Sequence, residues 1–107
     1  MNKIDSGKTK AIIAYVTIIG SLIAITMNME PKNSFARFHI RQAFGIHLIY
    51  HSFAIFLNYS HVNSGWLLLY AFYIVSLGYG LFGAINQKQQ LLPLLGQYFQ
   101  KWFTFIP

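Results

Sequence analysis

The most constraining feature of this chain is the placement of its charges. The eight Lys and Arg residues form three clusters, which long uncharged apolar runs separate. Between Arg41 and Lys88 there is no Asp, Glu, Lys or Arg. A soluble domain of 107 residues normally covers its outside with such residues and cannot leave so long an interval uncharged. The pattern predicts a chain whose apolar runs face lipid and whose charges mark the membrane boundaries.

Composition supports the same class of protein. The chain is 55% hydrophobic and 9% charged, whereas soluble domains are about 25% charged. Its formal net charge is +6, but the bases flank apolar spans and form no stripe with base-stacking aromatic residues. We therefore expect anionic lipid headgroups as partners and no nucleic acid. The absence of cysteine excludes a disulfide framework and a thiolate metal site.

The apolar pattern predicts a single all-α integral membrane domain with three apolar helices and an amphipathic, interfacial C-terminal helix. The bend Glu30–Asn33 should break the chain after the first helix, and Asn33 or Ser34 should cap the second. Pro93 fits the first turn of the last helix. The predicted elements are a basic tail over residues 1–10, helices over 11–29, 34–59 and 65–86, and the interfacial helix over 91–106.

The path of the first apolar segment allows two topologies. A continuous helix gives three spans, but both sides of the membrane then carry basic loops. If the segment enters and returns, with a kink near Gly20 and Ser21, all eight bases lie on the cytoplasmic side. The unbroken arc of small residues favours the continuous helix, and the re-entrant path stays open as the alternative.

Small residues form stripes on the first and third apolar segments. Close approach of two helices requires such stripes, so the two segments are expected to pack against each other. The alternative interpretation is that these stripes reflect only the ordinary glycine and alanine content of membrane helices. The predicted packing residues are Gly20, Ser21, Ala24, Ser76, Gly80 and Ala84.

Polar side chains concentrate on one face of the second segment, within an arc of about 120°. These residues are His39, His47, Tyr50, His51 and Asn58. The spacing of His47 and His51 lets both face one ligand, so a metal or haem is an alternative. Only Asp5 and Glu30 are acidic, and no other segment within the bilayer supplies a histidine. We therefore expect hydrogen bonding between helices, with no cofactor, no metal and no catalytic residue.

Basic side chains at the helix ends are expected to bind lipid headgroups by extending toward phosphate. The predicted boundary residues are Lys32, Arg37, Arg41 and Lys101.

Two short motifs resemble a known family. The stretch Phe35–Phe44 is similar to the R-F-x-x-x-Q-A signature of the chloroplast inner-envelope protein import component and its small bacterial relatives. The stretch Gly83–Asn86, followed by Leu92–Leu95, is similar to the C-terminal part of that family. The resemblance implies a membrane fold, a location in a bacterial inner (cytoplasmic) membrane and a role related to protein translocation. The plant proteins are four-helix translocon subunits, whereas this chain has three clear apolar segments. The matched boundary and packing residues are Arg37, Phe38, Arg41, Gln42, Ala43 and Pro93.

These observations predict a small, non-enzymatic accessory or scaffold subunit of a larger membrane complex, bound to other membrane subunits or to copies of itself. Two functions of other classes remain open. One is an oligomeric channel or carrier for a small solute, with His51 or Asn58 along its pathway. The other is a haem-binding or metal-binding redox protein that uses His47 and His51.

Overall fold

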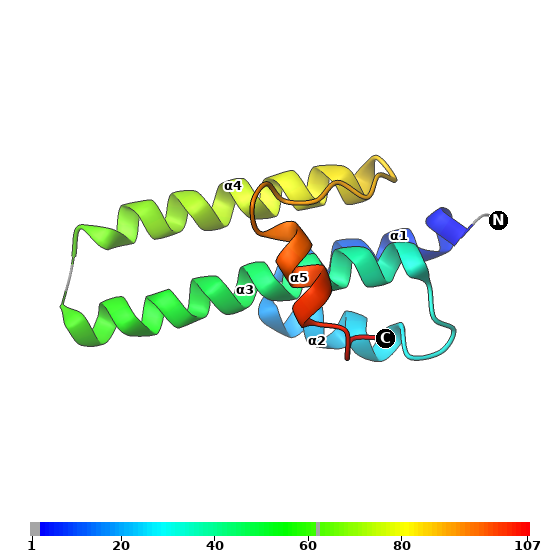
Figure 1. The fold of residues 1–107 in the computed structure, drawn as a ribbon, viewed down its shortest axis with the longest axis horizontal. Helices are drawn as coiled ribbons and strands as arrows, with labels where there is room; N and C mark the ends of the chain where they lie inside the picture. Colours follow the sequence, from blue (N-terminus) through cyan, green and yellow to red (C-terminus); the bar gives the residue numbers. More distant parts are fainter. Residues whose placement is uncertain (1–2, 62) are drawn as a thin grey trace.

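The computed structural model describes residues 3–61 and 63–107, with side chains described from residue 7 onward (Figure 1). The side chains of Lys3 and Asp5, which belong to the predicted basic tail, lie outside this description. The described part of the chain contains five helices and no strand, within an elongated envelope of 49 × 23 × 21 Å. The helices are α1 (Lys3–Val16), α2 (Ile18–Met27), α3 (Ser34–Ser60), α4 (Gly65–Ile85) and α5 (Gly96–Trp102). The predicted all-α class is confirmed.

The first apolar segment is broken at Thr17, so the prediction of one continuous helix over residues 11–29 is wrong. Thr17 is extended, with φ −152° and ψ 174°, and it caps α2 by accepting a hydrogen bond from the Gly20 amide at 3.0 Å. The break lies three residues before the kink considered in the re-entrant alternative. The predicted tail also differs, because α1 already begins at Lys3.

α1 and α2 form an antiparallel hairpin. At its closed end, the hydroxyl of Ser21 donates to the carbonyl of Ala14 at 2.7 Å. A Cβ atom on Gly20 would collide with the carbonyl oxygen of Ile13, so only glycine permits this approach of the two backbones. At the open end, the Lys10 ammonium donates to the side-chain oxygen of Asn28 at 3.2 Å. The first and second basic clusters therefore lie at the same end of the molecule.

α3 and α4 form a longer hairpin whose turn lies at the far left of Figure 1. Asn33 caps α3 as predicted, since its side-chain oxygen accepts from the Ala36 amide at 2.9 Å. α3 ends one residue beyond its predicted end, and α4 ends one residue before its own. His61 closes α3 in the left-handed region, with φ 56°.

The core surrounds the first half of α3. α1 lies centrally and contacts α2, α3 and α4, and α5 covers another side of α3 (Figure 1). The half of the α3–α4 hairpin near its turn extends beyond α1, so its apolar side chains stay exposed. These exposed side chains include Phe53, Ile55, Phe56, Leu67, Leu68, Ile74 and Val75.

The C-terminal segment folds onto α3 and is less helical than predicted. α5 covers only Gly96–Trp102, and Pro93 precedes it instead of occupying its first turn. Leu94, with φ 70°, has a left-handed conformation that a helix cannot include. Phe99 is buried against Gly45, where any Cβ atom would collide with the Phe99 ring. The predicted interfacial helix over 91–106 is therefore a short helix with irregular flanks.

Within the described residues, one helix is long and apolar enough to cross a membrane, namely Gly65–Ile85. α2 is apolar but shorter, with 10 residues.

Candidate functional site

All six predicted packing residues are buried, but the two stripes do not meet. No described residue of α2 packs against α4. The α2 stripe faces α1 and α3, whereas Gly80 of α4 receives the ring of Tyr15 from α1. A Cβ atom on Gly80 would lie 2.7 Å from the Tyr15 hydroxyl oxygen. The expectation that the stripes pack on each other is wrong, because the break at Thr17 inserts α1 between them.

A buried polar network joins α1, α3 and the segment after α4. The hydroxyl of Tyr15 lies 2.7 Å from Nδ1 of His39, and Nε2 of His39 lies 2.7 Å from the carbonyl oxygen of Lys88. A carbonyl can only accept, so Nε2 carries the proton and Nδ1 accepts from Tyr15. His39 is thus held as one neutral tautomer between two partners.

Gln42 extends the same network, one helical turn further along α3. Its amide nitrogen donates to the Tyr15 hydroxyl at 3.1 Å and to the carbonyl of Gln90 at 3.2 Å. Its amide oxygen accepts from the backbone N–H of Leu92 at 2.7 Å. Both amide protons and the amide oxygen are paired, although the side chain is fully buried. Gln42 therefore fixes the 90–92 segment against α3.

Burial lowers the pKa of His39 to about 4, although its hydrogen bond to the Lys88 carbonyl acts in the opposite direction. Desolvation penalises the imidazolium form and outweighs the hydrogen bond to the Lys88 carbonyl. His39 is therefore neutral at physiological pH and serves the network as donor and acceptor at once.

The remaining members of the predicted polar face of α3 separate into two environments. His47 is buried, with Nδ1 at 2.7 Å from the Tyr73 hydroxyl and Nε2 at 3.0 Å from the Ala14 carbonyl oxygen. Tyr50 stacks on Tyr73, with ring centroids 3.9 Å apart. His51 and Asn58 are exposed, in the second half of α3.

The hydrogen bonds of His47 disfavour its use as a metal or haem ligand. Both ring nitrogens of His47 are engaged, so ligation would break at least one hydrogen bond. No group of three or more His, Cys, Asp or Glu residues that could hold a metal occurs in the described part of the chain.

Three of the four predicted headgroup residues line one pocket of about 470 Å³. Its cations come from the loop before α3 and from the first two turns of α3, and its opposite wall is the C-terminal segment. Lys101 is exposed on α5 and does not line it. The lining residues are Met29, Lys32, Arg37, Arg41, Thr104, Phe105, Ile106 and Pro107.

Arg41 forms the inner wall of this pocket and holds the C-terminal segment in place. Its terminal nitrogens donate to the carbonyls of Gln100, Thr104 and Ile106 at 3.5, 3.3 and 3.2 Å. Its Nε is buried and has no partner among the described residues. Burial and the nearby Arg37 lower the pKa of the Arg41 guanidinium.

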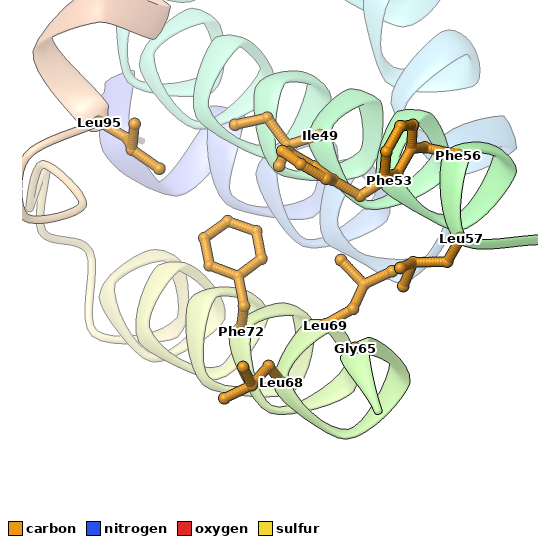
Figure 2. Close-up of a pocket in the computed structure, with 9 residues that line it drawn as sticks. All are labelled: Ile49, Phe53, Phe56, Leu57, Gly65, Leu68, Leu69, Phe72 and Leu95. Atoms are coloured by element: carbon orange, nitrogen blue, oxygen red, sulfur yellow. The ribbon is translucent and has the colours of Figure 1, made fainter. Parts of the chain in front are cut away.

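A second cavity of about 530 Å³ opens between α3 and α4 near their turn (Figure 2). Phe53 and Phe56 of α3 and Leu68 and Phe72 of α4 line it, together with Leu95 from the segment before α5. Every residue that lines the cavity is apolar or glycine.

The sequence interpretation identified the polar residues of α3 but missed two of their partners. Tyr15 and Tyr73 supply the hydroxyls that His39 and His47 bind. A tyrosine inside an apolar run is itself a signal, because a buried hydroxyl needs a hydrogen-bond partner.

A scan against protein-family models found no match, and searches of curated proteins and of solved structures found no significantly similar chain. The resemblance of Phe35–Phe44 to the import component therefore stays a prediction.

Proposed function

We propose that this chain is an integral membrane scaffold subunit that binds partner membrane proteins through the apolar α3–α4 hairpin. α4 crosses the bilayer, and α3 crosses it after Gln42, with its first two turns at headgroup level. The α1–α2 hairpin enters from the same side and returns. Irregular backbone at membrane depth is tolerated where its polar groups have partners within the protein. The side-chain oxygen of Thr17 accepts from the Gly20 amide, and its carbonyl accepts from the Ser21 amide.

The observation that carries this proposal is the separation of charge from exposed apolar surface. Lys10, Lys32, Arg37 and Arg41 gather around the start of α3 and the C-terminal segment. The far half of the α3–α4 hairpin carries no Asp, Glu, Lys or Arg and exposes large apolar side chains. In water such a surface would be strongly unfavourable, whereas lipid or another apolar helix can cover it.

The hairpin also explains why a partner is expected. Leu67 and Leu68 of α4 are 78% and 75% exposed, and Phe56 of α3 is 62% exposed. The chain's own helices cover the first half of α3 but leave this part open (Figure 1). A helix from a second membrane protein can pack here, and the translocation-related role implied by the family resemblance is one such setting.

Labelling of single cysteines tests the topology, because the natural chain contains no cysteine. Lys8→Cys and Lys32→Cys should react with a membrane-impermeant reagent from the same side, and Ser64→Cys should react from the opposite side. Labelling of residues 8 and 32 from opposite sides would contradict the returning path. Release of the chain from membranes by alkaline carbonate would contradict integral insertion altogether.

Purification from native membranes in mild detergent tests the scaffold role. A stoichiometric partner should co-purify and should be lost when Leu67→Ser is combined with Phe56→Ser, while Lys88→Gln retains it. A lone homo-oligomer would overturn the subunit proposal and favour the channel or carrier. A visible absorption band or bound metal that His47→Ala abolishes would favour the redox alternative.

A further inference from the structure

We infer that the pocket formed by Lys32, Arg37 and Arg41 is a binding site for the phosphate group of an anionic lipid. The inference rests on the proposed membrane location and deepens it, because it assigns one defined site in place of a diffuse basic boundary. The site is composite, since the C-terminal segment supplies one of its walls.

The side chains that line the pocket favour an anion. Three cationic side chains line it, and none of its lining residues is Asp or Glu. The chain has only two acidic residues, Asp5 and Glu30, and Glu30 is not among the lining residues. Arg37 and Arg41 are one helical turn apart on α3, so their guanidinium groups repel each other. A bound phosphate would offset this repulsion.

The hydrogen-bonding capacity of the pocket points to phosphate. Arginine presents a planar fork of donors that matches phosphate oxygens, and lysine adds a point charge. The terminal nitrogens of Arg41 donate to backbone carbonyls. Its Nε is buried and has no partner in the described structure. In the described part of the chain, the hydrogen bonds from the pocket's cations to the C-terminal segment all come from Arg41, and none comes from Arg37 or Lys32. They are therefore the donors available to a ligand.

The other lining residues favour a lipid as the source of the phosphate. Met29 and Phe105 are 58% and 70% exposed, so apolar side chains stand directly beside the cations. A free phosphate ion gains nothing from such neighbours, whereas a lipid places acyl chains next to its phosphate. The pocket also lies at the basic end of the molecule, which the proposed topology puts at headgroup level.

The test uses the full chain purified in neutral detergent, with anionic phosphatidylglycerol as the probe and zwitterionic phosphatidylcholine as the reference. Native mass spectrometry counts retained lipids, and a titration measures affinity. Wild type should retain one phosphatidylglycerol in preference to phosphatidylcholine. Removal of two charge-assisted contacts in Lys32→Gln/Arg37→Gln should weaken phosphatidylglycerol binding about tenfold or more.

The matched control is Lys8→Gln/Lys88→Gln, which removes the same net charge from positions outside the pocket. This control should change the affinity less than about twofold. Arg37→Gln alone is also measured, because a single substitution at this half-buried position disturbs the fold less than the double variant does. Equal losses in the two double variants, or no preference of wild type for phosphatidylglycerol, would overturn the inference.

Inorganic phosphate distinguishes the two sources of the ligand. The assignment to lipid would be overturned if millimolar phosphate competed for the site and if phosphatidylglycerol bound no more tightly than phosphate alone. Failure of phosphate to compete, together with specific phosphatidylglycerol binding, supports it. These measurements are made in detergent, so their failure is distinguishable from failure of the topology, which labelling in membranes reports.

Discussion

Replacement of Gln42 by methionine should lower the free energy of unfolding by about 4 to 5 kcal/mol. Methionine has nearly the same length and volume, so the change removes the amide with little repacking. Three hydrogen bonds, to Tyr15, Gln90 and Leu92, are lost together. At about 1 kcal/mol each they account for about 3 kcal/mol, and the Leu92 N–H left without its partner adds about 1 to 2 kcal/mol.

The assay is equilibrium unfolding in detergent micelles, followed by far-ultraviolet circular dichroism. Amide hydrogen exchange gives an independent local readout, because the Leu92 amide should lose protection in Gln42→Met. The matched control is Gln89→Met, at an exposed position of the same segment, which should change stability by less than about 0.5 kcal/mol.

A double-mutant cycle isolates one bond of the network. Tyr15→Phe combined with Gln42→Met should give a coupling energy of about 0.5 to 1.5 kcal/mol, the range of interhelical hydrogen bonds. A loss below about 1 kcal/mol in Gln42→Met, with unchanged exchange of the Leu92 amide, would refute the role assigned to Gln42.

Three further predictions concern other parts of the fold. Because the folded pKa of His39 is about 4 and its ordinary value is 6.5, the unfolded chain binds the proton first as the pH falls. Stability should be constant above about pH 7.5 and lower by about 2 kcal/mol at pH 5, and the slope between these values should be smaller in His39→Gln, as measured by unfolding at several pH values. Gly80→Ala should cost about 1 to 3 kcal/mol because its Cβ meets Tyr15, whereas Gly78→Ala, with nothing within 4 Å, should be neutral or stabilising in the same assay. Thr17→Ala should cost about 1 kcal/mol through loss of the α2 cap, and an equal effect of the exposed Thr9→Ala would argue against a specific cap.

The α3–α4 hairpin was predictable because its signals are local. Asn33 follows a helix-breaking stretch and caps α3, and the polar turn before Gly65 separates two apolar runs. Helix ends of this kind depend on a few adjacent residues, so the predicted ends of α3 and α4 lie within one residue of the observed ends.

The break at Thr17 was not predictable from periodicity. Small residues continue on one arc through Asn28, because α2 buries that face against α1 and α3. The same arc would arise in an unbroken helix packed on a neighbour. Only the return of the chain, which brings Ser21 to the Ala14 carbonyl, distinguishes the two cases.

The C-terminal segment shows a similar limit. Its amphipathic pattern is typical of an interfacial helix, but Phe99 inserts at Gly45 and Arg41 draws the last carbonyls toward α3. Contacts with a distant part of the chain thus replaced helix propensity over most of residues 91–106.

The sequence by itself determined which surfaces carry no charge, because the charges of this chain are confined to a few positions and its apolar runs are long. It also determined the cap of α3 at Asn33 and the burial of the small-residue stripes. The tertiary structure alone decided which polar groups meet. Tyr15, His39 and the Lys88 carbonyl come together from three separate segments. Periodicity reports the face on which a side chain lies, whereas a hydrogen bond depends on the three-dimensional position of a partner far along the chain.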